Sequence, residues 1–362
     1  MDNSTPKITK ESKNKIKVDF DRTPLKERLK AKFVNFYFFQ TVVIKIFRFI
    51  FLLGIAYVVL YPFFTKVAGS FMAPEDFVDV TVRLIPKNFT LDIYRDIWMF
   101  NDYFKALSNT LLISLICALI QTFACCVIAY GLAKYKFKGN GIIFLLVMLT
   151  MIIPHRTLQA SMSLNFTYFD IFGIFSFLSG GASVGIAGID NILASIHIMK
   201  YPDGINLINT YWPLIILSLT GLAFKNGLYI FMLRQFFRGI PDSLEESAYI
   251  DGSGDFRTFI QIIIPMSVPM MITVFLFAFC WQWTDSFYAS MFFTNPNKAP
   301  LVLSKIVEVP TEAQMVYAGQ NLYETAYKNT CGIMIILPLV IMYVFLQRYL
   351  VEGIERSGLT AE

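Results

Sequence analysis

Polar side chains interrupt two long apolar stretches of the sequence, at positions where they could contact a polar solute. Lys225 and Asn226 fall inside one apolar run, and the residues 281–285, Trp-Gln-Trp-Thr-Asp, close another. An ionisable side chain inside a lipid-facing stretch is costly, so it indicates a solute pathway. Aromatic faces suit the C–H faces of sugars, whereas amides and carboxylates suit their hydroxyls. The candidate contacts for such a solute are Lys225, Asn226, Trp281, Gln282, Trp283 and Asp285.

Each of these residues also has a purely structural explanation. Lys225 lines a cavity, extends its ammonium group toward the membrane surface, or pairs structurally with another residue. The two tryptophans either face a solute or anchor the helix end in the interfacial aromatic belt. Both alternatives stay open for the sequence alone.

Other chemistry is poorly supported by the pattern of residues. His155 and His197 have no catalytic or metal-spaced neighbours, so we expect no catalytic residue and no metal site. The cysteines fall in or beside apolar stretches and are expected to be packing residues: Cys117, Cys125, Cys126, Cys280 and Cys331. The glycine-rich stretch 180–185 lacks the lysine of a phosphate-binding loop. The chain is therefore predicted to be no enzyme and to bind no cofactor itself.

The composition predicts the elements that position these residues. Of the 362 residues 56% are hydrophobic and only 16% are charged, with a mean hydropathy of +0.55. Soluble proteins carry about 25% charged residues, so lipid must be the solvent for much of this chain. An all-α membrane protein with about six transmembrane helices is predicted, at 46–64, 107–132, 141–153, 211–233, 265–283 and 331–350. The third stretch is short and is expected to continue, kinked, through Pro154 toward Met162.

The distribution of Lys and Arg predicts the orientation of the chain. Ten of them lie in the first 32 residues, and Lys134, Lys136 and Lys138 crowd a short turn. By the positive-inside rule both termini are cytoplasmic. We divide the chain into a basic cytoplasmic arm (1–45), disordered or peripheral, a transmembrane domain (46–351) and a cytoplasmic tail (352–362). No cleavable signal peptide and no nucleic-acid partner are expected, and the first helix would be a retained signal anchor.

The segment 234–265 carries the most specific local pattern and is expected on the cytoplasmic side. Pro241 suits a helix start, and Ser243 with Glu246 predicts a capping box. Asp251 and Gly252 are expected to end the short helix, with Gly252 in a left-handed conformation. A second amphipathic helix begins near Asp255 and leads into the next membrane span at Pro265.

This segment resembles the EAA loop of permeases in ATP-binding-cassette importers, which reads Glu-Ala-Ala, three residues, Gly, nine residues, Ile-x-Leu-Pro. The matching positions are Glu246, Ser247, Ala248, Gly252, Ile262, Ile264 and Pro265, with Ser247 for Ala and Ile264 for Leu as mild departures. Further likeness to maltose-type carbohydrate permeases lies at 62–63, 109–111, 153–154, 234–237, 281–285 and 347–349. The resemblance covers neither the arm nor the outer loop at 164–208.

The resemblance implies a type I importer permease fold and a transport role. Two permease subunits would form the pathway, an ATPase dimer binding ATP and Mg would lie beneath them, and a solute-binding protein would deliver the solute. The residues implied in coupling to the ATPase are Ser243, Glu246, Ser247, Ala248, Asp251, Gly252, Ile264 and Pro265, and Asn109 joins the candidate pathway residues. The outer loop 289–328 would project toward the binding protein. The location would be the cell membrane of a bacterium, and the cargo a carbohydrate.

Two other classes remain as alternatives. An ion-coupled secondary transporter of a small polar solute would need acidic residues in mid-membrane, and the predicted helices contain almost none. A polytopic membrane enzyme would need a clustered catalytic set, which the sequence does not supply. Copurification of a second permease and an ATPase would separate an importer from both.

Overall fold

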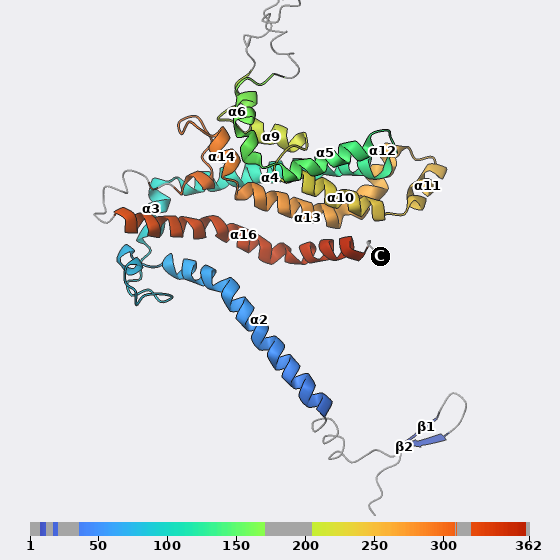
Figure 1. The fold of residues 1–362 in the computed structure, drawn as a ribbon, viewed down its shortest axis with the longest axis horizontal. Helices are drawn as coiled ribbons and strands as arrows, with labels where there is room; N and C mark the ends of the chain where they lie inside the picture. Colours follow the sequence, from blue (N-terminus) through green and yellow to red (C-terminus); the bar gives the residue numbers. More distant parts are fainter. Residues whose placement is uncertain are drawn as a thin grey trace, which may run out of the picture. The chain divides into compact units, whose positions relative to one another are not determined.

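The structure, a computed structural model, describes residues 8–11, 17–20, 36–170, 205–307, 309 and 320–359. Among the described residues from 36 onward, all the regular elements are helices (Figure 1). The longer elements there are α2 (Phe36–Gly69), α3 (Asp92–Phe100), α4 (Tyr103–Lys134), α5 (Asn140–Ile152), α6 (Gln159–Thr167), α9 (Trp212–Leu219), α10 (Asn226–Gly239), α11 (Asp242–Ile250), α13 (Ile264–Trp283) and α16 (Gln320–Leu359). Short elements are η1 (Pro74–Phe77), η2 (His155–Leu158), α12 (Asp255–Thr258), η3 (Phe259–Ile263), α14 (Phe287–Phe292) and η4 (Leu303–Lys305).

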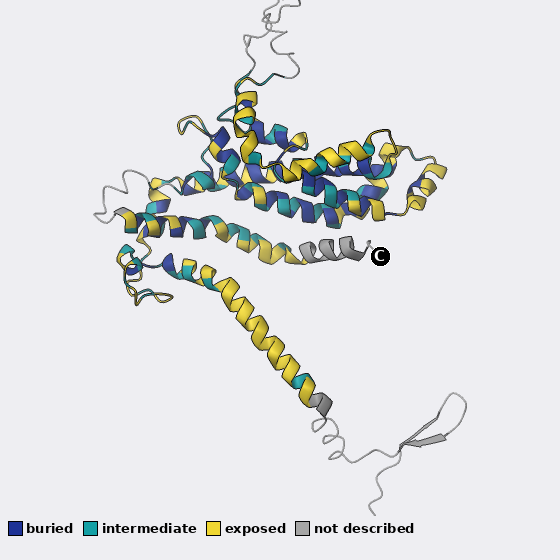
Figure 2. Cartoon of the chain, in the orientation of Figure 1, coloured by how far each residue is buried: buried dark blue, intermediate teal, exposed yellow. Residues whose placement is uncertain are grey.

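The chain divides into two units, residues 1–67 and 68–362. In the first, β1 (Ile8–Glu11) and β2 (Lys17–Phe20) form an antiparallel pair in which Ile8 lies opposite Phe20. This part of the arm therefore has secondary structure that its composition did not predict. The long helix α2 follows, and its most apolar stretch has no residue buried within the described structure (Figure 2). An apolar stretch without buried residues requires lipid or protein around it.

The second unit is built around α4, which packs against α9, α10 and α13, while α16 packs along α13. Figure 1 shows α4, α13 and α16 running side by side. The core between the helices of this unit contains small, aromatic and branched apolar residues, including Ala118, Cys125, Tyr229, Val274 and Tyr327, all buried. Small side chains let helices approach closely, which favours association within a membrane. The cysteines Cys117, Cys125, Cys126 and Cys331 are buried there, as predicted for packing residues.

The third predicted span is sharply bent at Pro154. The helices on either side, Asn140–Ile152 and His155–Thr167, differ in direction by 96°. A proline cannot donate a backbone hydrogen bond and disfavours helical geometry in the residue before it, and Ile153 is accordingly extended (ψ 121°). The predicted kink is confirmed and is better described as a break.

The fourth predicted span, 211–233, is wrong as a continuous helix. The chain forms α9, turns through 220–225, and starts again as α10. Gly221 (φ 75°) and Lys225 (φ 69°) both adopt left-handed conformations, which a helix cannot include. The polar pair Lys225–Asn226 marks the point of interruption in the sequence.

Consequently, within the described residues the helices long and apolar enough to cross a membrane number four, or five if the bent pair is one span. They are Phe39–Gly69, Tyr103–Lys134, Asp255–Trp283 and Asn321–Arg348, together with the pair broken at Pro154. The predicted total of about six included the interrupted stretch at 211–233, which accounts for the difference.

Part of the outer loop 289–328 packs against the bundle instead of projecting from it. The Asn109 side chain donates to Leu301 O (2.9 Å), and the Leu303 amide donates to Thr110 Oγ1 (2.9 Å). Val302, Leu303 and Ile306 are buried. The expectation of a projecting loop is therefore wrong for 301–306, while residue 308 and residues 310–319 lie outside the described part, as do 171–204 of the other outer loop.

Candidate functional site

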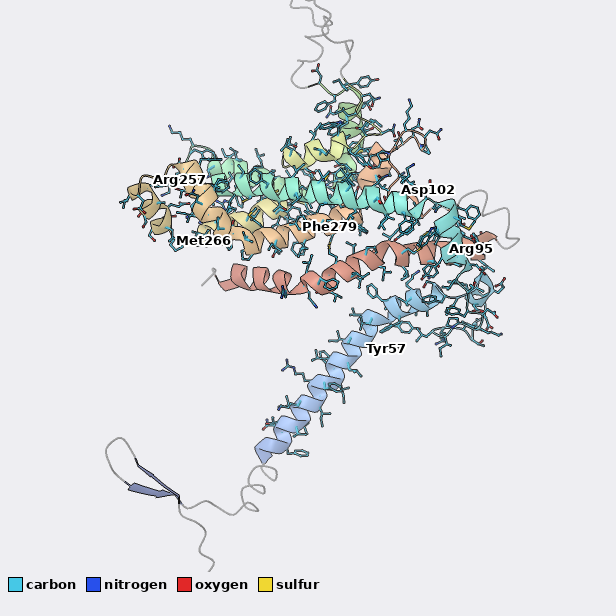
Figure 3. All side chains as sticks on the ribbon, turned by 180° about the vertical axis from the view of Figure 1, so that it is seen from behind. Tyr57, Arg95, Asp102, Arg257, Met266 and Phe279 are labelled. Carbon is cyan, nitrogen blue, oxygen red and sulfur yellow. The ribbon has the colours of Figure 1, made fainter. Side chains whose placement is uncertain are left out.

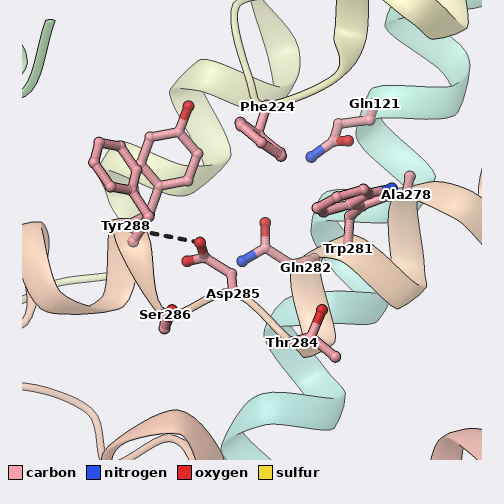
Figure 4. Close-up of a pocket in the computed structure, with 10 residues that line it drawn as sticks. Gln121, Phe224, Ala278, Trp281, Gln282, Thr284, Asp285, Ser286 and Tyr288 are labelled. Carbon is pink, nitrogen blue, oxygen red and sulfur yellow. Dashed lines mark hydrogen bonds between the residues drawn. The ribbon is translucent and has the colours of Figure 1, made fainter. Parts of the chain in front are cut away.

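A cavity of about 160 Å³ lies where the turn before α10 meets α4, the end of α13 and the start of α14. Figure 4 shows aromatic rings and polar side chains converging on this space. Its polar members can accept and donate hydrogen bonds, and its rings offer flat apolar faces. The lining residues are Gln121, Phe224, Ala278, Trp281, Gln282, Thr284, Asp285, Ser286, Phe287 and Tyr288.

Asp285 is fixed at the edge of this cavity by the start of α14. Its Oδ1 accepts from the Tyr288 amide (3.2 Å) and its Oδ2 from the Ala289 amide (3.1 Å). A carboxylate before a helix satisfies amide groups that have no partner within the helix. The carboxylate is thereby oriented, and its remaining lone pairs are available to a cavity ligand.

A second cavity, of about 720 Å³, lies between the two helix breaks. Its walls come from the break at Pro154 on one side and from the turn 220–225 on the other. Lys225 lines it, and Phe224 lines both cavities. The Lys225 ammonium is 4.8 Å from the Phe224 ring centroid and 4.9 Å from that of Trp281. The cation thus lies beside two aromatic rings from different elements, whose own centroids are 5.2 Å apart.

The structure brings four of the predicted pathway residues to these cavities. Trp281, Gln282 and Asp285 line the smaller one and Lys225 the larger one. The other three residues lie elsewhere: Asn109 holds Leu301, Trp283 is buried and donates from Nε1 to Ile335 O (3.0 Å), and Asn226 is buried against α4. Asn226 has no hydrogen-bond partner for its side chain among the described residues.

Sequence reasoning missed Gln121, Phe224 and Tyr288 in this site. Gln121 is a buried amide in the middle of α4, and its Nε2 donates to Ser218 Oγ (3.2 Å). A polar residue inside a 32-residue apolar helix was a usable signal, because burying it in lipid is costly. Phe224 and Tyr288 resemble any other aromatic residue of a membrane protein, so nothing in the sequence singled them out.

At the far end of the bundle, α11 ends as the sequence predicted. Gly252 is left-handed (φ 82°), its amide donates to Tyr249 O (3.0 Å), and the Ser253 amide donates to Ala248 O (2.9 Å). These two bonds form a Schellman cap, in which a glycine at positive φ closes the helix. The short helix and sharp turn after Asp251 are therefore confirmed.

The predicted capping box is wrong. The helix begins at Asp242, with Pro241 as its N-cap, so Ser243 is already within the first turn. The Asp242 Oδ1 lies 2.7 Å from Lys134 Nζ, and this hydrogen bond, followed by the lysine's charge, lowers the pKa of Asp242. Lys134 is 108 residues from Asp242 in the sequence. Its contact with Asp242, together with the helix dipole at the N-terminus, favours a start of α11 at Asp242 instead of after Ser243. Ser243 serves instead as an acceptor, since its carbonyl receives the Ser247 hydroxyl (2.7 Å).

Neighbouring glutamates of α11 have opposite environments. Glu245 is buried, with its Oε1 receiving the Tyr130 hydroxyl (3.0 Å) and its Oε2 lying 3.6 Å from Lys134 Nζ. Glu246 is exposed, whereas Ala248 is buried. Glu245 thus ties α11 to the end of α4, and Glu246 is left on the outer surface of the loop.

Beyond the turn, the backbone continues as one helical run from Asp255 to Trp283. Arg257, Met266 and Phe279 mark its course in Figure 3. It includes a π-helical segment, Phe259–Ile263, just before Ile264 and Pro265, where one prolonged turn accommodates the proline. The predicted second helix and fifth span are therefore a single element, and Ile250 and Phe256 beside the turn are 86% and 79% exposed.

Comparison with known proteins agrees with this architecture. Residues 125–356 match the family described as binding-protein-dependent transport system inner membrane component. The polygalacturonan/rhamnogalacturonan transport system permease protein YtcP of Bacillus subtilis is 27% identical over 309 residues, covering 84% of this chain and 93% of that protein. The arabinooligosaccharides transport system permease protein AraQ of the same species is 24% identical over 320 residues, covering 85% and 93%.

A solved structure shares the fold. It is the crystal structure of a bacterial ABC transporter involved in the import of the acidic polysaccharide alginate, with a TM-score of 0.60 at 19% identity. The match covers 86% of this chain and 97% of that one. The family match spans well over half of the sequence, and the helical membrane architecture agrees with it. The chain therefore belongs to the inner-membrane permease components of binding-protein-dependent ABC importers.

Proposed function

We propose that this chain is one of two permease subunits of a bacterial importer that moves a carbohydrate into the cytoplasm. The observation that carries the proposal is the composition of the smaller cavity. Trp281, Phe224 and Tyr288 supply aromatic faces, and Gln121, Gln282 and Asp285 supply hydrogen-bonding groups around the same space. Rings beside amides and a carboxylate match the alternating apolar and hydroxylated surfaces of a sugar.

The printed descriptions of the relatives support the same cargo class. YtcP is described as a polygalacturonan/rhamnogalacturonan permease and AraQ as one for arabinooligosaccharides. An alpha-glucoside transport system permease protein, AglG of Rhizobium meliloti, is 26% identical over 269 residues. Because these cargoes share sugar chemistry but differ in linkage and charge, they support a saccharide cargo without selecting one.

Membership of the family implies an ATPase and a solute-binding protein as partners. In the proposed complex a second, different permease subunit completes the pathway, and an ATPase dimer binds ATP and Mg. Both termini and the α11 loop face the cytoplasm, where the loop contacts the ATPase. The exposed side chains Glu246, Ile250 and Phe256 offer one charge and two apolar groups to that partner.

Two continuous helices connect this loop with the cavity. α4 joins α11 through Tyr130 and Lys134, and the same helix carries Gln121 in the cavity wall. The run Asp255–Trp283 begins beside the α11 turn and carries Trp281 and Gln282 at its other end. A displacement of α11 by the ATPase would therefore reach the cavity along both helices, because packed helices move as rigid elements.

Reconstitution of the complete complex tests the function. The permease pair, the ATPase and the binding protein are placed in proteoliposomes, and ATP-dependent uptake and ATPase stimulation are measured over a panel of oligosaccharides. We expect stimulation by at least one saccharide, together with copurification of the ATPase. Copurification without stimulation by any saccharide, but with stimulation by amino acids or peptides, would contradict the carbohydrate cargo.

A further inference from the structure

Lys225 has an unusual combination of charge, position and surroundings. Of the described residues that line the larger cavity, it is the one with a permanent charge. It is partly buried, and it closes the turn that interrupts the predicted fourth span. A cation at such a position is costly in a low-dielectric region unless a partner compensates its charge.

No anionic partner compensates this charge within the described ranges of the chain. Neither an ion pair nor a side-chain hydrogen bond involves the Lys225 ammonium there. The carboxylate that lines the smaller cavity, Asp285, is engaged by the amides of Tyr288 and Ala289. The rings of Phe224 and Trp281 attract the cation but contain no hydrogen-bond acceptor of ordinary strength, so its three N–H donors remain available.

The geometry holds this cation beside the sugar-binding surface proposed above. Trp281 lines the smaller cavity, Phe224 lines both, and both rings lie within 5 Å of the ammonium group, at 4.9 and 4.8 Å. The left-handed backbone of Lys225 (φ 69°) fixes where the side chain starts. A sugar ring stacked on Trp281 would therefore have its substituents within reach of the ammonium.

We infer that the ammonium group of Lys225 receives a carboxylate of the cargo, so that the cargo is an acidic saccharide containing uronic acid residues. The inference rests on the proposed carbohydrate function and narrows its substrate class. One carboxylate balances one ammonium, and charge-assisted hydrogen bonds are about twice as strong as neutral ones. A phosphate group carries nearly two charges and would leave one uncompensated beside a single lysine. Asp285, lying at the other cavity, suits the hydroxyl groups of the same cargo.

The test uses the complete transporter in proteoliposomes with paired substrates. One panel contains oligogalacturonate, oligomannuronate and oligoglucuronate, and the other contains the same oligosaccharides as methyl esters, which keep the shape and lose the charge. Wild-type protein should import at least one acidic oligosaccharide. Lys225→Met should slow that import about tenfold to hundredfold, as expected for the loss of one charge-assisted contact, whereas Lys225→Arg should retain most of it. Any methyl ester that is imported should be unaffected by Lys225→Met.

Several results would overturn the inference. If the wild type imported only methyl esters or other neutral saccharides, the inference would be overturned and the carbohydrate function would remain. Unchanged import of the acidic panel by Lys225→Met would likewise overturn the inference and leave the carbohydrate function intact. Import of no oligosaccharide from either panel would overturn the inference, and import of no ordinary neutral saccharide in addition would refute the proposed function itself. Vesicles of pure phosphatidylcholine and vesicles containing phosphatidylglycerol separate a lipid anion from a cargo anion. A defect confined to the phosphatidylglycerol vesicles would assign the lysine to lipid and overturn the inference. Normal copurification of the ATPase with Lys225→Met shows that the variant is assembled.

Discussion

Lys134, the last residue of α4, forms an ion pair with Asp242, the first residue of α11, with 2.7 Å between Nζ and Oδ1. The same ammonium donates to Ile240 O (2.8 Å) and lies near the buried Glu245. One side chain therefore joins the end of a membrane helix to the start of the proposed coupling helix. The joint makes the position of α11 dependent on α4.

Replacement of Lys134 should loosen this joint without affecting insertion. Lys134→Met leaves Glu245 with only its Tyr130 partner and should cost about 1.5–3 kcal/mol of local stability. We expect uptake to fall while the ATPase still hydrolyses ATP, because the two activities become uncoupled. The exposed Lys138 of the same turn provides the control, and Lys138→Met should behave as wild type. Equal effects of the two variants would contradict a specific joint.

The ion pair between Lys134 and Asp242 should not depend on pH in the neutral range. Lys134 lowers the pKa of Asp242, so Asp242 stays charged at any pH above that lowered pKa. The uptake defect of Lys134→Met should therefore be equal at about pH 5 and about pH 8.

Gly252 should be sensitive to any side chain that resists positive φ. Gly252→Asp strains the Schellman cap and adds a side chain to the surface proposed to meet the ATPase. An added Cβ would meet no atom within 4 Å in this chain, so the protein should still insert. We expect loss of uptake and release of the ATPase from solubilised membranes. Gly254→Asp is the matched control, because Gly254 is the N-cap of α12 with φ −80°, where an aspartate is favourable. Near-normal uptake by Gly252→Asp would remove the main support for the coupling role.

The exposed apolar residues beside the turn should matter for assembly and not for folding. Ile250→Ser and Phe256→Ser remove apolar surface that is already exposed, so the melting temperature of the purified permease should change little. Retention of the ATPase during purification should fall, since each residue would lose about 1.5–3 kcal/mol of burial at an interface. Val80→Ser, in the segment after α2 and 87% exposed, is the control and should retain the ATPase fully. Full retention by all three variants would place the contact elsewhere.

Trp281 and Trp283 should respond oppositely to truncation, although they are two residues apart. Trp281 lines the cavity and is 46% exposed, so Trp281→Ala should reduce uptake strongly with little loss of stability. Trp283 is 3% exposed, so Trp283→Ala should destabilise the permease by about 3–5 kcal/mol. Thermal denaturation in detergent and transport assays on the same preparations compare the two. A stability loss with Trp281→Ala as large as that with Trp283→Ala would contradict the assignment of Trp281 to the cavity.

Labelling can test the orientation. Single cysteines introduced at Asp2 and Glu362 in a cysteine-free background should be inaccessible to an impermeant thiol reagent on intact cells. The reason is the concentration of Lys and Arg in the arm and in the turn after α4. Permeabilised cells provide the positive control. Labelling of either position before permeabilisation would show that the positive-inside reading of this chain is wrong.

Local signals were sufficient where the structure depends on local geometry. The left-handed Gly252 and the break at Pro154 follow from what glycine and proline permit, and the sequence predicted both. The start of α11 does not follow from local geometry. Lys134, at the end of another helix, forms an ion pair with Asp242, and this contact favours a helix start at Asp242 over the capping pattern at Ser243. A pattern search cannot anticipate such a contact, since it depends on the tertiary arrangement.

The candidate site was predictable in part for the same reason. Lys225, Trp281 and Asp285 were identified because polar groups in apolar stretches are conspicuous. Phe224 was not identified from the sequence, because its role depends on its position: it lines both cavities, and its ring lies beneath the Lys225 ammonium. The interruption of 211–233 was also missed, since the mean hydropathy of a stretch does not register two left-handed residues within it.

At the first turn of α10, Gly227 packs directly against α5, where it meets the side chains of Thr150 and Met151 and the carbonyl of Val147. A Cβ added at Gly227 would lie 2.7 Å from Thr150 Oγ1 and 3.0 Å from Val147 O. This contact forms one wall of the larger cavity. A side chain at Gly227 would not fit without moving these α5 atoms, so we expect the size of the larger cavity to be changed more easily at other lining residues, such as Phe166 and Ile216. Engineering a transporter of this type for a bulkier cargo should therefore begin with Phe166 and Ile216 and leave Gly227 unchanged.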